Sequence, residues 1–149
     1  MIQMMNRWLK IWMVIIIFIS MISLILMAES SSKEYLKAHN QVRAAVGIEP
    51  LKWNFRLTQN ARKFAEKHNA GYKGDIAYEK SLYNYGINIA RFFGSNTPEK
   101  DVVGLWAKQK KYYDYESNSC INNNTCDNYL QIVWRSTTSV GCARGNVFQ

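Results

Sequence analysis

The sequence predicts an α+β domain, because three helical patterns precede two short strand patterns along a single chain. The chain has 149 residues, of which 48% are hydrophobic, and this is enough for one domain with one core. It shows no internal repeat and no low-complexity linker. We therefore expect residues 31–149 to fold as one unit behind an N-terminal segment of different character.

The N-terminal segment, residues 1–30, predicts a secretory signal peptide. Arg7 and Lys10 precede an apolar run from Ile11 to Ala28, and small residues stand on either side of Glu29. A membrane span needs roughly 17–25 apolar residues, so an uncleaved signal anchor is the alternative. The small residues favour cleavage, which predicts a secreted, extracellular protein.

The formal net charge of +8 predicts attraction to anionic surfaces such as cell-wall polymers or microbial membranes. Nucleic acid is not expected as a partner, because the basic residues are scattered and no nucleic-acid-binding motif accompanies them. The one tight cluster, Lys108, Lys110 and Lys111, is interpreted as a solvated helix face.

The first helix of the domain is predicted to begin at a capping box, Ser31-Ser32-Lys33-Glu34, and to end at Gly47, with Pro50 just beyond. Its apolar positions place His39 on the inner face. A histidine in such a place is typically a hydrogen-bonded core residue rather than a ligand.

Two further helices are predicted from residues that typically begin a helix. The second is predicted from Asn54 or Arg56 to His68, with His68 at its exposed or half-buried end. The third is predicted to start at Thr97 as N-cap, with Pro98 in the first helical position. A short helix is also expected around residues 88–93.

The two strands are predicted near the end of the chain. CDNYLQIVW, from Cys126 to Trp134, is rich in residues that suit a half-buried pleated surface, and a second strand is expected from Val140 to Arg144.

The cysteines are interpreted for an oxidising compartment. Cys120 and Cys126 enclose a short polar loop and are plausible disulfide partners. Cys142 is then left over, which indicates an intermolecular bond, a free thiol or a lost partner. Asn123 begins a glycosylation sequon inside the loop. The spacing of cysteines and histidines argues against a structural zinc site.

Aromatic residues are dense between Tyr72 and Phe93, and this density allows two interpretations. The rings of Tyr83, Tyr85 and Phe92 could line a binding surface for an apolar ligand. Alternatively, they fill a loop-rich core with their hydroxyls directed to water, a position to which tyrosine is well suited.

Several short motifs along the domain occur together in a specific order and spacing. They are Ala38-His39-Asn40 with Arg43, Pro50-Leu51-Lys52-Trp53, Asn88-Ile89-Ala90, Trp106, Tyr113-Asp114-Tyr115, Ser117-Asn118-Ser119-Cys120, Cys126, Tyr129, Gln131-Ile132-Val133-Trp134-Arg135 and Gly141-Cys142-Ala143-Arg144. The chain resembles the plant pathogenesis-related class-one proteins of the CAP superfamily in these motifs. The resemblance implies an α-β-α sandwich with a small antiparallel sheet between helical layers, secretion to the apoplast or cell wall, disulfides, and roles in plant defence and sterol or lipid binding.

The central cleft of this family usually carries two histidines and two glutamates, which suit a divalent metal. At the matching positions this sequence has Lys80, Ile87, Gln109 and Asn128. These side chains cannot hold zinc tightly as a group or supply a general base at neutral pH. The resemblance therefore predicts a cleft without metal, cofactor or catalytic residue, beside a segment, CDNYLQIVW, that only holds a sheet together.

Two departures from the family concern its cysteines and its last strand. Ile76 stands where the family has a cysteine, and the resemblance implies that this missing cysteine is the partner of Cys142. The family normally continues beyond Gln149 through two more cysteines and a final strand. An incomplete domain with an exposed sheet edge is therefore an expectation, either as a truncated or as a decaying paralogue.

Three functions follow as hypotheses. We favour a secreted, non-enzymatic CAP protein of plant defence, antimicrobial or antifungal, that acts as a monomer through its basic surface and an apolar groove. A metal-dependent hydrolase would need the replaced histidines and glutamates. A product without independent function would fail to fold.

Overall fold

The computed structural model describes residues 2–68, 83–92 and 97–145. By its contacts the chain divides into two units, Met1–Lys33 and Glu34–Gln149. A long helix, α1 (Ile2–Ala44), runs from the first unit into the second. The remaining elements of the second unit are β1 (Lys52–Trp53), α2 (Phe55–Lys67), α4 (Glu99–Ala107), the 3₁₀-helix η1 (Lys108–Tyr112), β2 (Tyr113–Asp114), β3 (Ser119–Cys120), α5 (Asp127–Ile132) and β4 (Ser139–Val140).

The first unit is the N-terminal part of α1 and is apolar and exposed. The helix between Arg7 and Ala44 contains a segment long and apolar enough to cross a membrane, by length and composition alone. A signal sequence close to the N-terminus passes the same test, so this finding is compatible with the predicted signal peptide.

The predicted helix start at Ser31 is wrong, because α1 passes through this residue without interruption. Neither proline nor glycine occurs before Gly47, so nothing in the chain breaks the helix earlier. The local polar groups support its continuation: the Ser32 hydroxyl donates to the Glu29 carbonyl at 2.9 Å, and Lys33 forms an ion pair with Glu29 at 2.7 Å. The predicted end is confirmed, since Gly47 has a positive φ of 65° just past the helix.

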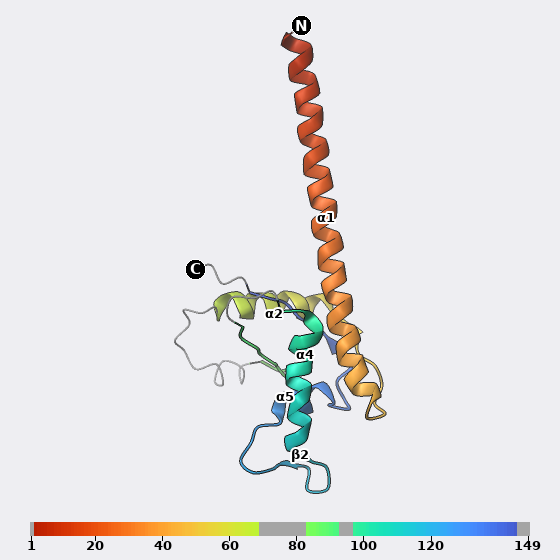
Figure 1. Cartoon of the computed structure of the whole chain (residues 1–149), viewed down its shortest axis with the longest axis vertical. Helices are drawn as coiled ribbons and strands as arrows, with labels where there is room; N and C mark the ends of the chain where they lie inside the picture. Colours follow the sequence, from red (N-terminus) through yellow and green to blue (C-terminus); the bar gives the residue numbers. More distant parts are fainter. Residues whose placement is uncertain (1, 69–82, 93–96, 146–149) are drawn as a thin grey trace. The chain divides into compact units, whose positions relative to one another are not determined.

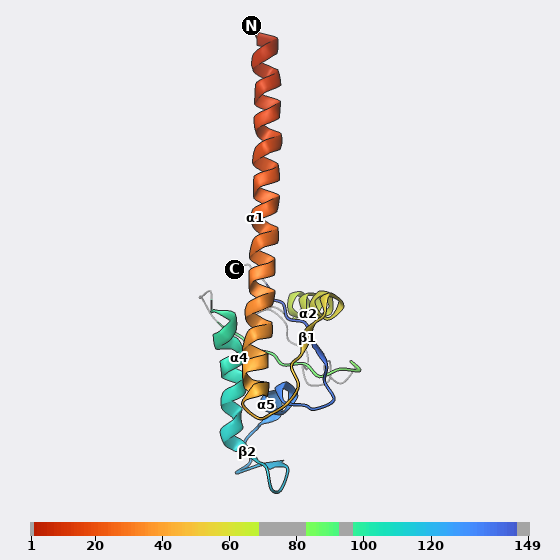
Figure 2. The same ribbon diagram turned by 90° about the vertical axis from the view of Figure 1, so that its right-hand side faces the viewer.

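The core of the second unit lies between the last turns of α1, α4 and α5 (Figures 1 and 2). Both views show the C-terminal end of α1 beside α4, with α5 next to the far end of α4. The buried cluster consists of Tyr35, Ala38, Val102, Val103, Trp106 and Ile132. It joins residues about a hundred positions apart in the sequence, so it holds the ends of the domain together.

The helix α2 was predicted correctly in position, and Asn54 is its N-cap, with a side-chain oxygen that accepts from the backbone N–H groups of Arg56 and Leu57. Its last residue differs from the prediction. His68 is buried at 7% exposure instead of exposed or half-buried, because its ring stacks on Phe64 with centroids 4.0 Å apart.

The start of α4 also differs. Thr97 is not its N-cap; Pro98 takes the cap position, and no side chain caps the helix. The Pro98 carbonyl instead accepts from the N–H groups of Asp101 and Val102. The Thr97 carbonyl accepts a hydrogen bond from the guanidinium of Arg144. This bond connects the start of α4 to the segment that follows β4.

The prediction that CDNYLQIVW forms a strand is wrong, because residues 127–132 form the helix α5. Tyr129 and Ile132 are buried at 4% and 1% exposure, three residues apart, which is helical spacing. Apolar residues in this segment recur both at the two-residue period of a strand and at the three- to four-residue period of a helix. The segment forms a helix because its buried face packs against α4.

The short helix expected around residues 88–93 is also wrong, as residues 86–92 have no regular secondary structure and residue 93 lies outside the described part. Two side-chain hydrogen bonds attach this segment to neighbouring elements. Asn88 Nδ2 donates to the Asn128 carbonyl at 2.8 Å, and Trp106 Nε1 donates to the Ile89 carbonyl at 3.2 Å.

The α+β class is confirmed, with two small sheets of two strands. The expected antiparallel pairing holds for β2 and β3, whereas β1 and β4 run parallel, with Lys52 opposite Ser139 and Trp53 opposite Val140. The second predicted strand is displaced, because only its first residue, Val140, belongs to β4. A long crossover separates β1 from β4, as parallel strands require.

Candidate functional site: an aromatic cavity and an adjoining polar cavity

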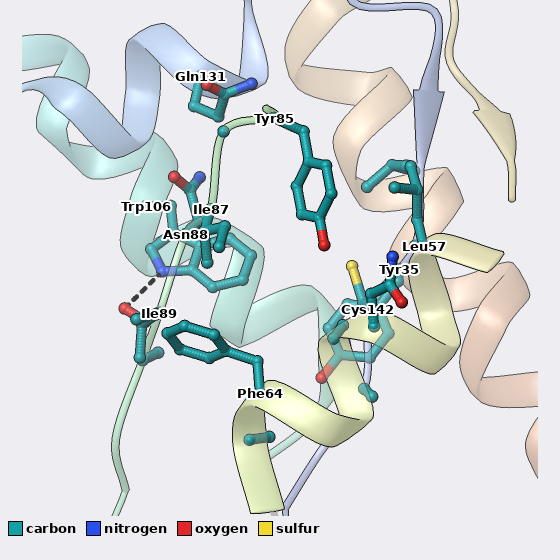
Figure 3. A pocket seen from close by; sticks show the side chains of 18 of the residues that line it. Tyr35, Leu57, Phe64, Tyr85, Ile87, Asn88, Ile89, Trp106, Gln131 and Cys142 are labelled. Atoms are coloured by element: carbon teal, nitrogen blue, oxygen red, sulfur yellow. Dashed lines mark hydrogen bonds between the residues drawn. The ribbon is translucent and has the colours of Figure 1, made fainter. Parts of the chain in front are cut away.

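A cavity of about 930 Å³ lies in the second unit between the end of α1, α2, the 83–92 segment and the residues after β4. Figure 3 shows that its walls are mainly aromatic and aliphatic, with Phe64 and Leu57 from α2 facing Ile87 and Tyr85. Ligand pockets in proteins measure about 300–1,000 Å³ and combine apolar walls with a few polar groups. This cavity has the size and the lining of such a pocket.

The three aromatic residues that sequence reasoning selected, Tyr83, Tyr85 and Phe92, all line this cavity. Tyr83 makes an edge contact with Phe64 at 5.8 Å between centroids and a tilted contact with Tyr85 at 5.3 Å. The hydroxyl of Tyr85 points into the cavity (Figure 3). Tyr85 and Phe92 are 38% and 40% exposed, so both rings can reach a ligand without a change in the core.

The cavity depends on close contact between backbones at Gly141. A Cβ atom at this position would lie 2.3 Å from the Thr58 backbone nitrogen and 2.6 Å from the Leu57 carbonyl carbon. Any side chain would therefore force the segment after β4 away from α2, and the two walls of the cavity would separate.

Burial favours the neutral form of three titratable groups in the cavity walls, Cys142, His39 and Tyr35. Burial raises the pKa of the Cys142 thiol to about 12, and burial lowers the pKa of His39. The His39 Nδ1–H donates to the Tyr35 carbonyl at 2.8 Å, which confirms the predicted hydrogen-bonded core histidine. Burial also raises the pKa of Tyr35, against the opposing effect of its hydrogen bond with Arg144. A protonated thiol is a poor nucleophile, so this lining suits binding better than covalent chemistry.

A smaller cavity of about 380 Å³ adjoins the first and shares Ile89 and Trp106 with it. Two of the four predicted cleft positions, Gln109 and Asn128, line this smaller cavity. They are 19 residues apart, and Gln109 Oε1 accepts from the Asn128 backbone N–H at 2.9 Å. Ile87 lines the larger cavity instead.

The fourth cleft position, Lys80, lies outside the described residues. Within the described ranges, no group of three or more histidine, cysteine, aspartate or glutamate residues is placed to hold a metal ion. The donors at Gln109 and Asn128 are amides, which are weak ligands for zinc.

The disulfide between Cys120 and Cys126 is present and closes the polar loop. Cys142 is a free, half-buried thiol that lines the larger cavity. Asn123 is exposed in the disulfide loop with a φ of 55°, so the sequon is accessible. Lys108, Lys110 and Lys111 are exposed on η1, in agreement with a solvated face.

Sequence reasoning did not recognise the part that Arg43 plays. This residue is 1% exposed, and its guanidinium donates to the carbonyls of Glu49 at 2.7 Å, Ile132 at 2.8 Å, Trp134 at 2.9 Å and Thr137 at 3.1 Å. It therefore ties α1 to the C-terminal end of α5 and the turn that leads to β4. Its only signal in the sequence was its place in a family motif.

Asn40 makes a second connection of this kind. Its side chain donates to the Leu51 carbonyl at 3.1 Å and accepts from the Leu51 N–H at 2.7 Å, so α1 fixes the residue before β1. Both connections position the cavity walls, because β1 pairs with β4.

The described part of this α+β domain thus combines a disulfide-closed loop with an aromatic cavity and an adjoining polar one. Residues 36–147 match the CAP family, described as the cysteine-rich secretory protein family, and the chain belongs to this family.

The relatives in this family are plant pathogenesis-related proteins. The chain is 42% identical over 120 residues to the pathogenesis-related protein PRMS of Zea mays, a match that covers 78% of this chain and 68% of that protein. It is 38% identical over 117 residues to pathogenesis-related protein 1A of Nicotiana tabacum, covering 78% and 67%. It is 36% identical over 119 residues to pathogenesis-related protein 1 of Arabidopsis thaliana, covering 80% and 70%.

Proposed function

We propose that this chain is an exported, non-enzymatic defence protein of the pathogenesis-related type, which binds a sterol or similar lipid in the larger cavity. The observation that carries the proposal is the cavity of about 930 Å³ with walls of Phe64, Tyr83, Tyr85 and Phe92. The rigid, mainly apolar body of a sterol is complementary to such walls, and its hydroxyl would meet the hydroxyl of Tyr85.

The non-enzymatic part of the proposal is supported by the chemistry of the described walls. The thiol of Cys142 and the imidazole of His39 are neutral, and the amides at Gln109 and Asn128 do not act as general bases. The half-buried position of Cys142 also disfavours an intermolecular disulfide, so we propose a monomer.

The lipid-binding proposal is tested with a fluorescent sterol, dehydroergosterol, and competition by cholesterol. Alanine at Tyr83 or at Phe92 should weaken sterol affinity by about tenfold or more, because each change removes a ring whose burial contributes about 1.5–3 kcal/mol. Alanine at Tyr115, which is 77% exposed on the β2–β3 turn, is the matched control and should leave affinity unchanged. Unchanged affinity in both cavity variants would remove the sterol site.

The export proposal rests on the apolar segment of α1 and is tested by expressing the full 1–149 sequence in plant cells. We expect a protein in the extracellular fluid whose N-terminus lies near Ser31. A product that stays in the membrane fraction with residues 11–28 intact would establish the signal-anchor alternative instead.

A further inference from the structure

The smaller cavity has a chemical character of its own. Its described lining contains two lysines and two amide side chains but no acidic residue, and its apolar wall includes Trp106 and Tyr112. It lies at one end of the core, between α4, η1 and the start of α5.

The geometry of η1 directs two lysines to the same side. A 3₁₀-helix has three residues per turn, so side chains at positions i and i+3 stand above one another. Lys108 and Lys111 stand in this relation and both line the cavity, whereas Lys110 does not. The Lys111 ammonium also lies 4.6 Å from the centre of the Tyr112 ring, a cation–π contact that holds it at the cavity wall.

The amide of Gln109 adds a hydrogen-bond donor. Its oxygen already accepts from the Asn128 N–H at 2.9 Å, so the atom left for a ligand is its NH₂ group. The carbonyl of Asn128 accepts from Asn88 at 2.8 Å, which fixes this part of the cavity from a second side. The cavity thus presents positive charge and a donor, with no described carboxylate to repel an anion.

We infer that the smaller cavity binds the carboxylate of an acidic oligosaccharide, with Lys108 and Lys111 on the charge, Gln109 donating a hydrogen bond, and Trp106 and Tyr112 against the sugar ring. A volume of about 380 Å³ lies at the lower end of the range of about 300–1,000 Å³ for ligand pockets. Aromatic walls and amides match the apolar faces and hydroxyls of a sugar, whereas a membrane surface would not enter a cavity. The inference goes beyond the proposed sterol binding, gives a specific ligand to the predicted attraction to anionic surfaces, and is independent of the larger cavity.

The test uses the product of the full 1–149 sequence from a secreting plant host and measures binding of tetragalacturonate by calorimetry. The fully methyl-esterified oligosaccharide, which has the same chain without the charge, is the control ligand. The K108Q/K111Q double variant should bind tetragalacturonate about fivefold or more weakly, as expected for the loss of two partly exposed ion pairs. The variant K110Q removes one charge from the same helix outside the cavity and should change affinity by less than about twofold.

A second variant, Q109E, keeps the oxygen that accepts from Asn128 but places a negative charge in the cavity. We expect it to abolish tetragalacturonate binding while the unfolding midpoint stays the same. Equal binding of the esterified oligosaccharide, equal losses in K110Q and K108Q/K111Q, or no binding at all would overturn the inference. Preferential binding to phosphatidylserine vesicles that depends on the same two lysines would also overturn it, in favour of a lipid headgroup.

Sterol binding is measured on the same variants, so the two proposals can fail separately. Loss of carboxylate binding with intact sterol binding concerns only the smaller cavity. Loss of sterol binding in the Phe92→Ala variant with intact carboxylate binding concerns only the larger one.

Discussion

Replacement of Arg43 by alanine should destabilise the domain more than any exposed substitution. The side chain is 1% exposed and makes four hydrogen bonds to backbone carbonyls of Glu49, Ile132, Trp134 and Thr137. Single hydrogen bonds to charged groups contribute about 1.5–3 kcal/mol net, and bonds that share one guanidinium do not add in full. Breaking a buried charged network typically costs about 3–5 kcal/mol.

We therefore expect the free energy of unfolding to fall by about 3–5 kcal/mol in Arg43→Ala, a large part of the 5–15 kcal/mol that stabilises a typical domain. The assay is urea unfolding of the secreted protein, followed by tryptophan fluorescence. Arg43→Lys is the informative second variant, since an ammonium keeps the charge but lacks the planar fork that reaches several carbonyls.

Arg62→Ala, on the exposed face of α2, is the matched control and should change stability by less than about 0.5 kcal/mol. The reasoning would be refuted by an Arg43→Ala variant that unfolds within about 1 kcal/mol of the parent chain. It would also be refuted if Arg43→Lys were as stable as the parent chain. A single ammonium would then stabilise the domain as well as the four hydrogen bonds of the guanidinium do.

Four further predictions concern the disulfide, His39 and Cys142. The Cys120→Ser/Cys126→Ser double variant should lose about 2 kcal/mol in urea unfolding, the entropy expected for a loop this short; a loss below about 0.5 kcal/mol would contradict it. Burial lowers the pKa of His39, so the stability it contributes is present above pH 6.5 and is lost as the pH falls through the lower folded pKa. Acid unfolding should therefore be less steep in His39→Gln, and an unchanged pH dependence would argue against this. Burial raises the pKa of Cys142, so stability should decline as the pH rises from 9.0 to about 12, and less so in Cys142→Ala. Alkylation of this thiol by iodoacetamide at neutral pH should be slow in the folded protein and fast in urea; equal rates would refute the buried, protonated thiol.

The lining of the candidate site was predictable from the sequence where the signal was local. Tyr83, Tyr85 and Phe92 stand out as a dense aromatic stretch, and all three line the larger cavity. The positions of Gln109 and Asn128 were selected by resemblance, but their hydrogen bond joins residues from different elements and has no local signal. The same holds for Arg43, whose four acceptors lie up to 94 positions away.

The sequence by itself determined the features that depend on neighbours along the chain. These are the apolar N-terminal segment, the helix α2 with its Asn54 cap, the glycine that ends α1, the short disulfide loop and the motifs of the CAP family. Capping, turns and loop closure involve residues within a few positions, so their energies can be read from the order of residues.

Only the tertiary structure decided the secondary structure of segments whose hydrophobic pattern fits both a strand and a helix. CDNYLQIVW has apolar residues that fit a strand or a helix, and contact of Tyr129 and Ile132 with the core selects the helix. The 88–92 segment has no regular secondary structure, and its polar groups form hydrogen bonds with Trp106 and with the Asn128 carbonyl. Burial of surface and pairing of distant polar groups outweigh local propensities of a few tenths of a kcal/mol per residue, and these terms exist only once the chain has folded.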